Sequence, residues 1–494
     1  MKIPLSLGPS YQNRTLNNIQ RTVNWYPEET PEGWCLVSRP GLRRLDSVAN
    51  NAACRGAIYV DGINGPQWFT VNGNTVYELD SSGADTSRGT ISGSATQEVI
   101  LCVADTATQV YIIIVQPGIN AYYMETSAGS PTLIAGAGAP SNPLWCCFID
   151  QYVVLVNGTR NFYLSGLADP TSWGTLRTAQ AESLPDPITQ CFNLENKLML
   201  VGPGTIEGFY DTGNSSFPFE RVQGMIYDIG ATSGQRRPAA TINGNLFFIS
   251  STNGANNTFW SIGNKGKRKI STPVIDGQIN SQLAVEWEVE AWHELGHDFV
   301  KFHNFGHTTA GAATAGACYV WDDTFGCWHE RTSGGTSLQG TYRMKMAITG
   351  PQASRSLPFA FDNQDGSVYS LDESLSTDGA TPVAFDKIRD FGPIESGDDR
   401  VKHTRLRLDA EVKYDSTASP TLSATLQKSD NGGQSYDTGL TLSRVLASAT
   451  TAQKVRLEAR RLGAPRERYY RLTLSPQARI ILKLAELEAE AERS

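Results

Sequence analysis

Five segments of this chain share one pattern, in which two runs of β-branched and aromatic residues flank a tight polar turn. They are residues 69–77, 147–156, 191–200, 240–248 and 359–369. Asn-Gly between such runs is the strongest short hairpin signal, because both central residues of a type I′ turn need positive φ. With turn centres at Gly73, Gln151, Glu195 and Gly244, the last two steps are 44 and 49 residues. Steps of this size indicate four-stranded blades of a β-propeller.

The longer steps bound the number of blades. From Gly73 to Gln151 the chain covers 78 residues, which leaves room for a less regular blade around residues 109–115. From Gly244 to Gln364 it covers 120 residues, which leaves room for one or two more. We therefore expect an all-β, propeller-like domain of about six or seven blades over residues 51–390. An array of β-sandwiches also gives short strands at regular spacing and stays open as the alternative.

A second unit is expected after the repeats. Residues 401–414 alternate with period two, as a half-buried antiparallel strand does, and residues 421–427, 455–459 and 468–474 supply further strands. They predict a small C-terminal β-sandwich over residues 391–484. Residues 1–50 are expected to form an N-terminal arm and the first strands. The last residues, 485–494, are rich in Ala and Glu and suit a helix or a frayed tail.

Composition narrows the function classes. The 494 residues are 40% hydrophobic and 19% charged, with a formal net charge of −8, which argues against a surface built throughout to hold nucleic acid. No stretch is apolar enough for a membrane span, and the first 14 residues lack the hydrophobic core of a signal peptide, so we expect synthesis in the cytosol. The eight cysteines include no Cys-x-x-Cys pair, and we interpret them as buried small hydrophobic residues in a reducing compartment.

One motif has a catalytic interpretation. The string from His293 to His297 fits the H-E-x-x-H pattern of zinc proteases, with Glu294 as general base and His303 at the spacing of a third ligand. That chemistry needs the first two histidines one helical turn apart. Gly296 breaks a helix, and the residues after it alternate as in a strand, so we predict strand imidazoles, no metal site and no cofactor. A zinc hydrolase stays the enzymatic alternative.

A basic segment lies near the C-terminus. Residues 454–471 hold seven Lys and Arg against two Glu, a local charge of +5. The basic residues are Lys454, Arg456, Arg460, Arg461, Arg466, Arg468 and Arg471. On an acidic chain this concentration favours contact with a phosphate backbone or an acidic partner surface. The alternative is a solvated strand pair with partial ion pairing.

Residues 429–436 resemble an Asp-box hairpin, Ser-Asp-Asn-Gly-Gly-Gln-Ser-Tyr. In that motif the Asp caps backbone N–H groups and the aromatic residue packs beneath the turn. The segment has too few carboxylates for a tight calcium site, so we predict a structural turn. The resemblance by itself leaves a carbohydrate-binding propeller as a third functional alternative.

Four groups of short motifs follow one another along the chain. They are Ser10-Tyr11 with residues 20–27 and 39–42; residues 202–207, 209–210 and 217–221; residues 296–302, 319–322 and 326–331; and residues 429–433, 460–466, 470–474 and Pro476. In order and spacing they resemble the podophage packaged DNA stabilization protein family, also called the tail accessory or portal-closing tail hub. The family pattern includes Gly296-His297 but does not require His293-Glu294, which argues further against a protease.

This resemblance implies a structural, non-enzymatic protein of the phage tail. It implies a ring of six copies of the chain, bound below the portal and its head-to-tail adaptor, which closes the channel and retains packaged DNA until ejection. A distal needle, nozzle or fibre protein is a further implied partner, and no membrane partner is implied. Genomic DNA is expected to pass without sequence specificity, and an acidic lining would let the duplex slide without adhering, because it offers few phosphate contacts. The basic run at 460–466 falls within the family pattern, which favours a subunit-facing or DNA-facing role.

Overall fold

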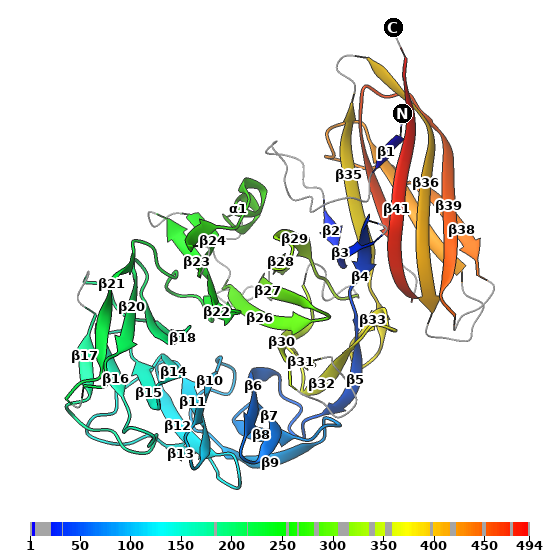
Figure 1. Cartoon of the computed structure of the whole chain (residues 1–494). Coiled ribbons are helices and arrows are strands. Elements are labelled where there is room, and N and C mark those ends of the chain that lie inside the picture. Colours follow the sequence, from blue (N-terminus) through cyan, green and yellow to red (C-terminus); the bar gives the residue numbers. More distant parts are fainter. Residues whose placement is uncertain are drawn as a thin grey trace.

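The computed structural model describes residues 2–4, 21–31, 33–181, 185–214, 216–252, 256–263, 266–280, 286–304, 316–334, 341–350, 358–395, 399–414, 421–446, 451–474 and 478–492. Within them the chain folds into two all-β units, a β-propeller and a β-sandwich (Figure 1). The fold class expected from the repeats is therefore confirmed, and the seven blades found lie within the predicted range.

Each blade of the described propeller is a sheet of four antiparallel strands. Blade 1 consists of β6 (Cys54–Gly62), β7 (Gly65–Asn72), β8 (Thr75–Leu79) and β9 (Asp85–Thr90), and blade 2 of β10 (Ile100–Asp105), β11 (Val110–Gln116), β12 (Asn120–Glu125) and β13 (Thr132–Leu133). Blade 3 consists of β14 (Trp145–Ile149), β15 (Tyr152–Val156), β16 (Asn161–Leu164) and β17 (Thr178–Gln180), and blade 4 of β18 (Gln190–Leu194), β19 (Lys197–Val201), β20 (Ile206–Asp211) and β21 (Phe219–Tyr227).

Blades 5 to 7 complete the ring. Blade 5 consists of β22 (Ala239–Ile242), β23 (Asn245–Thr252), β24 (Asn256–Gly263) and β25 (Gly266–Lys269). Blade 6 consists of β26 (Glu288–Glu294), β27 (His297–Asn304), β28 (Ala317–Asp322) and β29 (Cys327–Glu330). Blade 7 consists of β30 (Met344–Ile348), β31 (Phe359–Asp362), β32 (Ser367–Asp372) and β5 (Gly41–Ser47). Because β5 precedes blade 1 in the sequence, blade 7 combines both ends of the propeller, and β30 contacts β6 of blade 1. A helix, α1 (Pro273–Asn280), connects blades 5 and 6. Nowhere in the described chain is a helix long and apolar enough to cross a membrane.

Tight turns between the first and second strands set the repeat. In blades 3, 4 and 5 both central residues of this turn have positive φ: Asp150 (46°) and Gln151 (66°), Glu195 (51°) and Asn196 (58°), Asn243 (46°) and Gly244 (69°). These predicted turns are confirmed. Gly73 and Gln364, however, lie between the second and third strands of blades 1 and 7. The long steps of the sequence pattern therefore compared unlike turns.

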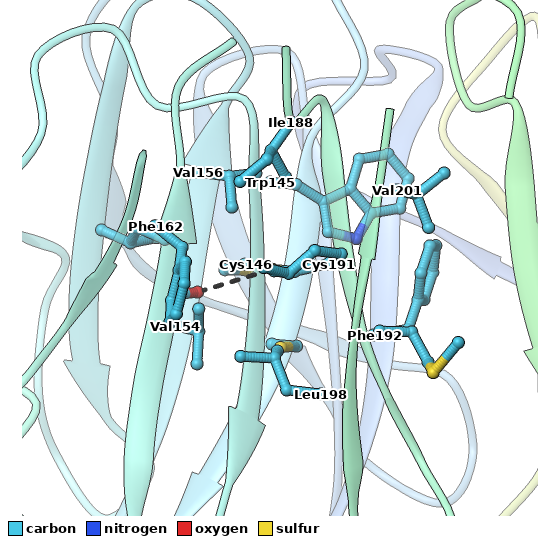
Figure 2. Packing of buried hydrophobic residues seen from close by; sticks show 14 of the residues in the cluster. Trp145, Cys146, Val154, Val156, Phe162, Ile188, Cys191, Phe192, Leu198 and Val201 are labelled. Atoms are coloured by element: carbon cyan, nitrogen blue, oxygen red, sulfur yellow. Dashed lines mark hydrogen bonds between the residues drawn. The ribbon is translucent and has the colours of Figure 1, made fainter. Parts of the chain in front are cut away.

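Apolar side chains fill the spaces between neighbouring blades. The largest buried cluster runs through blades 2 to 5 and includes Trp145, Phe162 and Phe248. Figure 2 shows part of this cluster, with Cys146 and Cys191 among the apolar side chains. All eight cysteines are free and seven are buried, as expected for small hydrophobic residues. Strands packed on both faces are apolar along their length, as in β15, which is buried at every position.

The sandwich consists of two sheets around one core. The first sheet has the strand order β3 (Trp25–Thr30), β4 (Gly33–Ser38), β41 (Ala478–Glu492), β36 (Arg400–Tyr414) and β39 (Gln453–Gly463), and β1 (Lys2–Pro4) also pairs with β41. The second sheet continues from blade 6 through β2 (Thr22–Val23) to β35 (Lys387–Glu395), β40 (Glu467–Leu474), β37 (Thr421–Ser429) and β38 (Leu440–Val445). Leu406, Leu457 and Leu487 belong to the core between them. A short pair, β33 (Thr377–Asp378) and β34 (Val383–Ala384), precedes β35, within which residue 390 lies.

The helix or frayed tail expected at the C-terminus is wrong for the described residues up to 492. Residues 485–492 are the second half of β41, which pairs with β36. Ala485, Leu487 and Ala489 are buried, whereas the Glu residues between them are partly or fully exposed. Glu488 accepts a hydrogen bond from Arg405 of β36 at 2.5 Å. Period-two alternation and opposite charges on the neighbouring strand outweigh helix propensities worth about half a kcal/mol per residue.

Candidate functional site

The zinc-protease string folds as a β-hairpin. Its turn residues, Leu295 and Gly296, have φ values of 53° and 86° and place Glu294 opposite His297 in the register of β26 and β27. The predicted strand after Gly296 is therefore confirmed as β27. His293 is exposed, and its Nδ1 lies 2.5 Å from the carboxylate of Asp298. A hairpin does not place the two imidazoles one helical turn apart, as zinc hydrolysis by this motif needs.

Glu294 and His297 have structural partners. Arg331 donates two hydrogen bonds, at 2.8 and 3.1 Å, to the buried carboxylate of Glu294. The ring of His297 lies between the carboxylates of Asp322 at 2.8 Å and Glu28 at 2.7 Å. Burial lowers the pKa of His297, but its hydrogen bonds and charge interactions with the two carboxylates outweigh burial and raise the pKa above its ordinary value. Because Glu28 belongs to β3, His297 joins the N-terminal strands to blade 6.

His303 lies at the opposite end of the same hairpin from His293. It is buried, with Nε2 3.8 Å from a carboxylate oxygen of Glu288. Burial and the nearby charges of Lys301 and Lys345 lower its pKa well below the ordinary value, so the ring is neutral. The candidate ligands His293, His297 and His303 thus do not converge. Across the described residues, no group of three or more His, Cys, Asp or Glu side chains is arranged to hold a metal ion.

The basic segment divides between the two sheets of the sandwich. Arg468 and Arg471 lie on β40, where they are structural. Arg468 is buried and contacts the carboxylate of Asp430 at 2.6 Å. Arg471 donates two hydrogen bonds to Asp390, both of 2.8 Å. These two arginines are already neutralised, and they do not form part of a free basic surface.

The remaining basic residues lie on β39 and in the loop that follows it. Arg456 pairs with Asp409 at 2.7 Å, and Arg460 pairs with Glu458 at 3.1 Å. The structure records no ion pair with another described residue for three exposed side chains, those of Lys454, Arg461 and Arg466. Of the seven basic residues that give the segment its local charge of +5, these three therefore remain available to a partner.

The Asp-box-like turn has different internal contacts from those expected. Asn431 Oδ1 accepts a hydrogen bond from the backbone N–H of Ser435, and Ser429 Oγ accepts one from the N–H of Gly433, both at 3.1 Å. Asp430 instead pairs with Arg468, as described above. The aromatic ring of Tyr436 lies 4.1 Å from the guanidinium of Arg471. The segment is a turn, with Ser and Asn in the capping role expected for Asp.

The first strands of the blades line a channel along the propeller axis. On the face where first and second strands join, the channel widens into a cavity of about 520 Å³, lined in part by Tyr59, Glu195, Asn243 and His293. A second cavity of about 340 Å³ lies against β10, β14, β18 and β22. We call the larger of these two cavities the wide mouth of the axis.

Charged side chains from several blades meet at the other end of the channel. Lys345 of blade 7 donates hydrogen bonds to Glu98, just before blade 2, at 2.6 Å and to Glu288 of blade 6 at 2.9 Å. Arg237, just before blade 5, pairs with Glu290 at 3.1 Å. Burial lowers the pKa of Lys345, but Glu288 and Glu98 outweigh burial and raise it above its ordinary value, so the ammonium stays charged. Since these pairs reach from blade 2 to blades 6 and 7, they close this end of the axis.

The face around the wide mouth is acidic on blades 1 to 4. First and third strands of a blade run in the same direction, so both end on this face. Their ends, the turns that follow and the first residues of the next strands carry these carboxylates: Asp61, Asp80, Asp85, Asp105, Glu125, Asp150, Asp169, Glu195 and Asp211. Only Arg177 and Lys197 oppose them at the described ends and turns. Burial and the negative charge of Asp211 raise the pKa of Asp150, which indicates that neighbouring carboxylates interact.

Sequence reasoning missed the buried charges on the axis. A signal was present, because Lys345 stands between Met344 and Met346, and Glu288 and Glu290 alternate with Trp287 and Val289. A charged residue inside an apolar strand needs a partner. The pattern does not reveal which one, because the residues that meet are more than 50 positions apart in the chain.

The comparison with family models agrees with the propeller. A family model, Phage_stabilise, described as "Bacteriophage P22 Gp10, beta-propeller", matches residues 1–373, which contain all seven blades. Among solved structures, the WD40 β-propeller domain of Doa1 is 12% identical, covers 67% of this chain and 97% of its own, and has a TM-score of 0.38. The computationally designed Ika8 protein is 10% identical, covers 67% and 99%, and has the same TM-score of 0.38. The search of curated proteins found no match.

Proposed function

The chain belongs to the Phage_stabilise family of bacteriophage structural proteins, and on that premise we propose that it is the hub or nozzle of a short phage tail. Copies of the chain form a ring, of six copies by the family resemblance, below the portal and its head-to-tail adaptor. The ring closes the channel, retains packaged DNA and supports a distal needle, nozzle or fibre. Its role is mechanical, not enzymatic.

The closed, rigid propeller is the observation that carries this proposal. The family match covers all seven blades, and buried ion pairs around Lys345 close one end of the axis. Cavities of about 520 and 340 Å³ cannot hold a DNA duplex. DNA therefore does not thread a single propeller, and the conduit lies between copies. Rigid wedges of this kind suit a ring that closes by rotation.

The acidic face suits the wall of a DNA conduit. Carboxylates such as Asp105, Asp150 and Glu195 repel phosphates, so the duplex slides without adhering. Lys454, Arg461 and Arg466 instead suit an acidic protein neighbour. Reversing Asp105 and Asp150 to Lys should slow ejection in a salt-dependent way. Ejection rates that do not respond to salt in these variants would count against the lining role.

The enzymatic and carbohydrate-binding alternatives gain no support from the site. His293, His297 and His303 are dispersed over a hairpin, and Glu294 is held by Arg331. A sialidase-like propeller needs an arginine cluster at the axis, whereas the wide cavity is lined by no arginine among the described residues.

A reconstruction of the native particle by electron microscopy tests the proposal. We expect the chain as a ring directly below the adaptor. Particles assembled without the chain should package DNA and then lose it, as measured by the ratio of filled to empty heads. Absence of the chain from purified virions, or stable filled heads without it, would overturn the proposal.

A further inference from the structure

The open edge of the sandwich is the first of two unusual surfaces. β38 and β39 end their sheets, and among the described strands β38 pairs only with β37 and β39 only with β36. A groove of about 810 Å³ runs between them. Leu440 is 47% exposed and Val445 68%. An uncovered edge strand offers a row of backbone N–H and C=O groups to another strand. We call β38, β39 and this groove the sandwich edge.

The sandwich edge is basic as well as apolar. Residues 440–463, from the start of β38 to the end of β39, contain five Lys and Arg and one Glu. Arg444 and Lys454 line the groove. Natural edge strands are protected by charge, but here exposed Val445 stands beside exposed Arg444. This combination fits an acidic surface that also carries apolar side chains.

The outer rim of blades 2 to 4 has the complementary chemistry. Five of the nine exposed large hydrophobic residues in the described chain belong to blades 2 to 4: Leu133 and Ile226 on the outermost strands β13 and β21, Tyr210 on β20, and Leu167 and Leu176 in the loop before β17. Residues 51–230, which contain blades 1 to 4, have six Lys and Arg and sixteen Asp and Glu, and of these carboxylates the exposed Glu220 and Asp228 lie on and directly after β21. With nine residues, β21 is the longest of the described outermost strands β9, β13, β17, β21 and β25. We call this surface the blade rim.

The two surfaces lie at opposite ends of the molecule. Figure 1 shows blades 3 and 4, with β17 and β21, at the lower left and the sandwich at the upper right. One copy therefore cannot join its own two surfaces. Contact between different patches of successive copies is heterologous, and a heterologous contact that closes by rotation gives a ring.

We propose that the sandwich edge of one copy binds the blade rim of the next, with β38 pairing along β21. Six residues of β38 match part of the nine residues of β21, and strand addition satisfies backbone groups on both edges. In this contact the exposed apolar side chains of Val445 and Ile226 become buried, and the basic sandwich edge faces the acidic blades. The inference rests on the ring of the proposed function and names the surfaces that form it.

Two charge variants test the contact in the full-length chain. Val445→Glu places a carboxylate where the acidic rim of the neighbour arrives, and Ile226→Lys places a cation where the basic edge arrives. We expect each variant alone to associate at least about tenfold more weakly, because each places a like charge in the contact. Mixed in equal amounts, the two variants should recover the ring, because the new carboxylate meets the new cation. Native mass spectrometry of the purified chains, and of rings released from particles, measures the fraction of the chain in rings and the fraction in single copies.

The control is Ile63→Glu, which changes a side chain that is 73% exposed on blade 1, away from both surfaces. It should assemble as the wild type does, and circular dichroism should show unchanged folding for all three variants. Normal rings from both single variants, or a mixture that stays dissociated, would overturn the inference while the ring itself stands. A wild-type chain that forms no ring in solution or in particles would overturn the proposed function together with it.

Discussion

The propeller and the sandwich both contain ion pairs, and the contrast is clearest between two buried pairs of the propeller and an exposed pair of the sandwich. In the propeller, the side chains of Arg331–Glu294 and Lys345–Glu98 are at most 5% exposed. In the sandwich, those of Arg456 and Asp409 are 53% and 24% exposed on the outer face of a sheet. A buried charge that loses its partner costs about 3–5 kcal/mol, whereas an exposed pair contributes about 1 kcal/mol or less. A buried pair such as Arg331–Glu294 therefore determines packing, whereas an exposed pair such as Arg456–Asp409 only adjusts stability.

The strand β41 is where the sandwich should be most vulnerable. Removing residues 485–494 deletes buried Leu487 and half of a strand that lies between β4 and β36. We expect the sandwich to lose on the order of 5 kcal/mol or more, from apolar burial and ladder hydrogen bonds, while the propeller persists. Limited proteolysis with mass mapping should find cuts within residues 400–474. Deleting only residues 493–494 is the matched control, and equal resistance of both chains would contradict the prediction.

The pair Arg331–Glu294 should have the largest single-residue effect in the propeller. Arg331→Met leaves a buried carboxylate without its cation and should lower the free energy of unfolding by about 3–5 kcal/mol. Denaturant unfolding followed by tryptophan fluorescence measures the loss. Adding Glu294→Gln removes the orphan charge and should restore most of the stability. A double variant as unstable as the single one would show that packing, not charge, sets the cost.

Two histidines should make the regions respond to pH with opposite sign. Burial and the charge of Arg468 lower the pKa of His403 in the sandwich to about 4. The unfolded chain then takes up the proton first, so this stabilisation is present above about pH 6.5 and is lost as the pH falls toward 4. His297 in blade 6 has a raised pKa, so its stabilisation is complete below about pH 6.5 and is lost as the pH rises through the folded-state pKa.

The measurement is the difference in melting temperature between wild type and His403→Gln, and between wild type and His297→Gln, at several pH values. The first difference should shrink toward acid and the second toward alkali. Parallel pH profiles for the two variants would contradict the assigned environments.

An exposed pair in the sandwich should have the smallest effect. Arg456→Ala breaks its contact with Asp409, which keeps Arg407 as a second partner. We expect a change of about 1 kcal/mol or less that decreases with added salt. Denaturation at low and high ionic strength measures it. A salt-independent loss as large as that of Arg331→Met would remove the contrast between the two regions.

Local signals predicted much of the fold. Turns at Gln151, Glu195 and Gly244 were recognisable because a tight hairpin restricts φ at neighbouring residues. The alternation after Gly296 predicted a strand and weakened the zinc hypothesis. The same rule, applied to residues 485–492, would have identified β41, because Ala and Leu alternate there with Glu. Helix propensity was a poorer guide, since it ignores the arginines on the adjacent strand.

The sequence by itself determined the strand-rich repeats, their tight turns and a second unit after them, because these depend on residues close together in the chain. Only the tertiary structure decided that β5 completes blade 7, that β3 and β4 join the sandwich, and that Lys345 meets Glu98 across the axis. It also decided which basic residues stay free, since Arg468 pairs with Asp430 in the turn after β37 and Arg471 pairs with Asp390 on β35. Such partners are far apart in sequence, and burial, which sets the strength of each pair, exists only after the blades have closed.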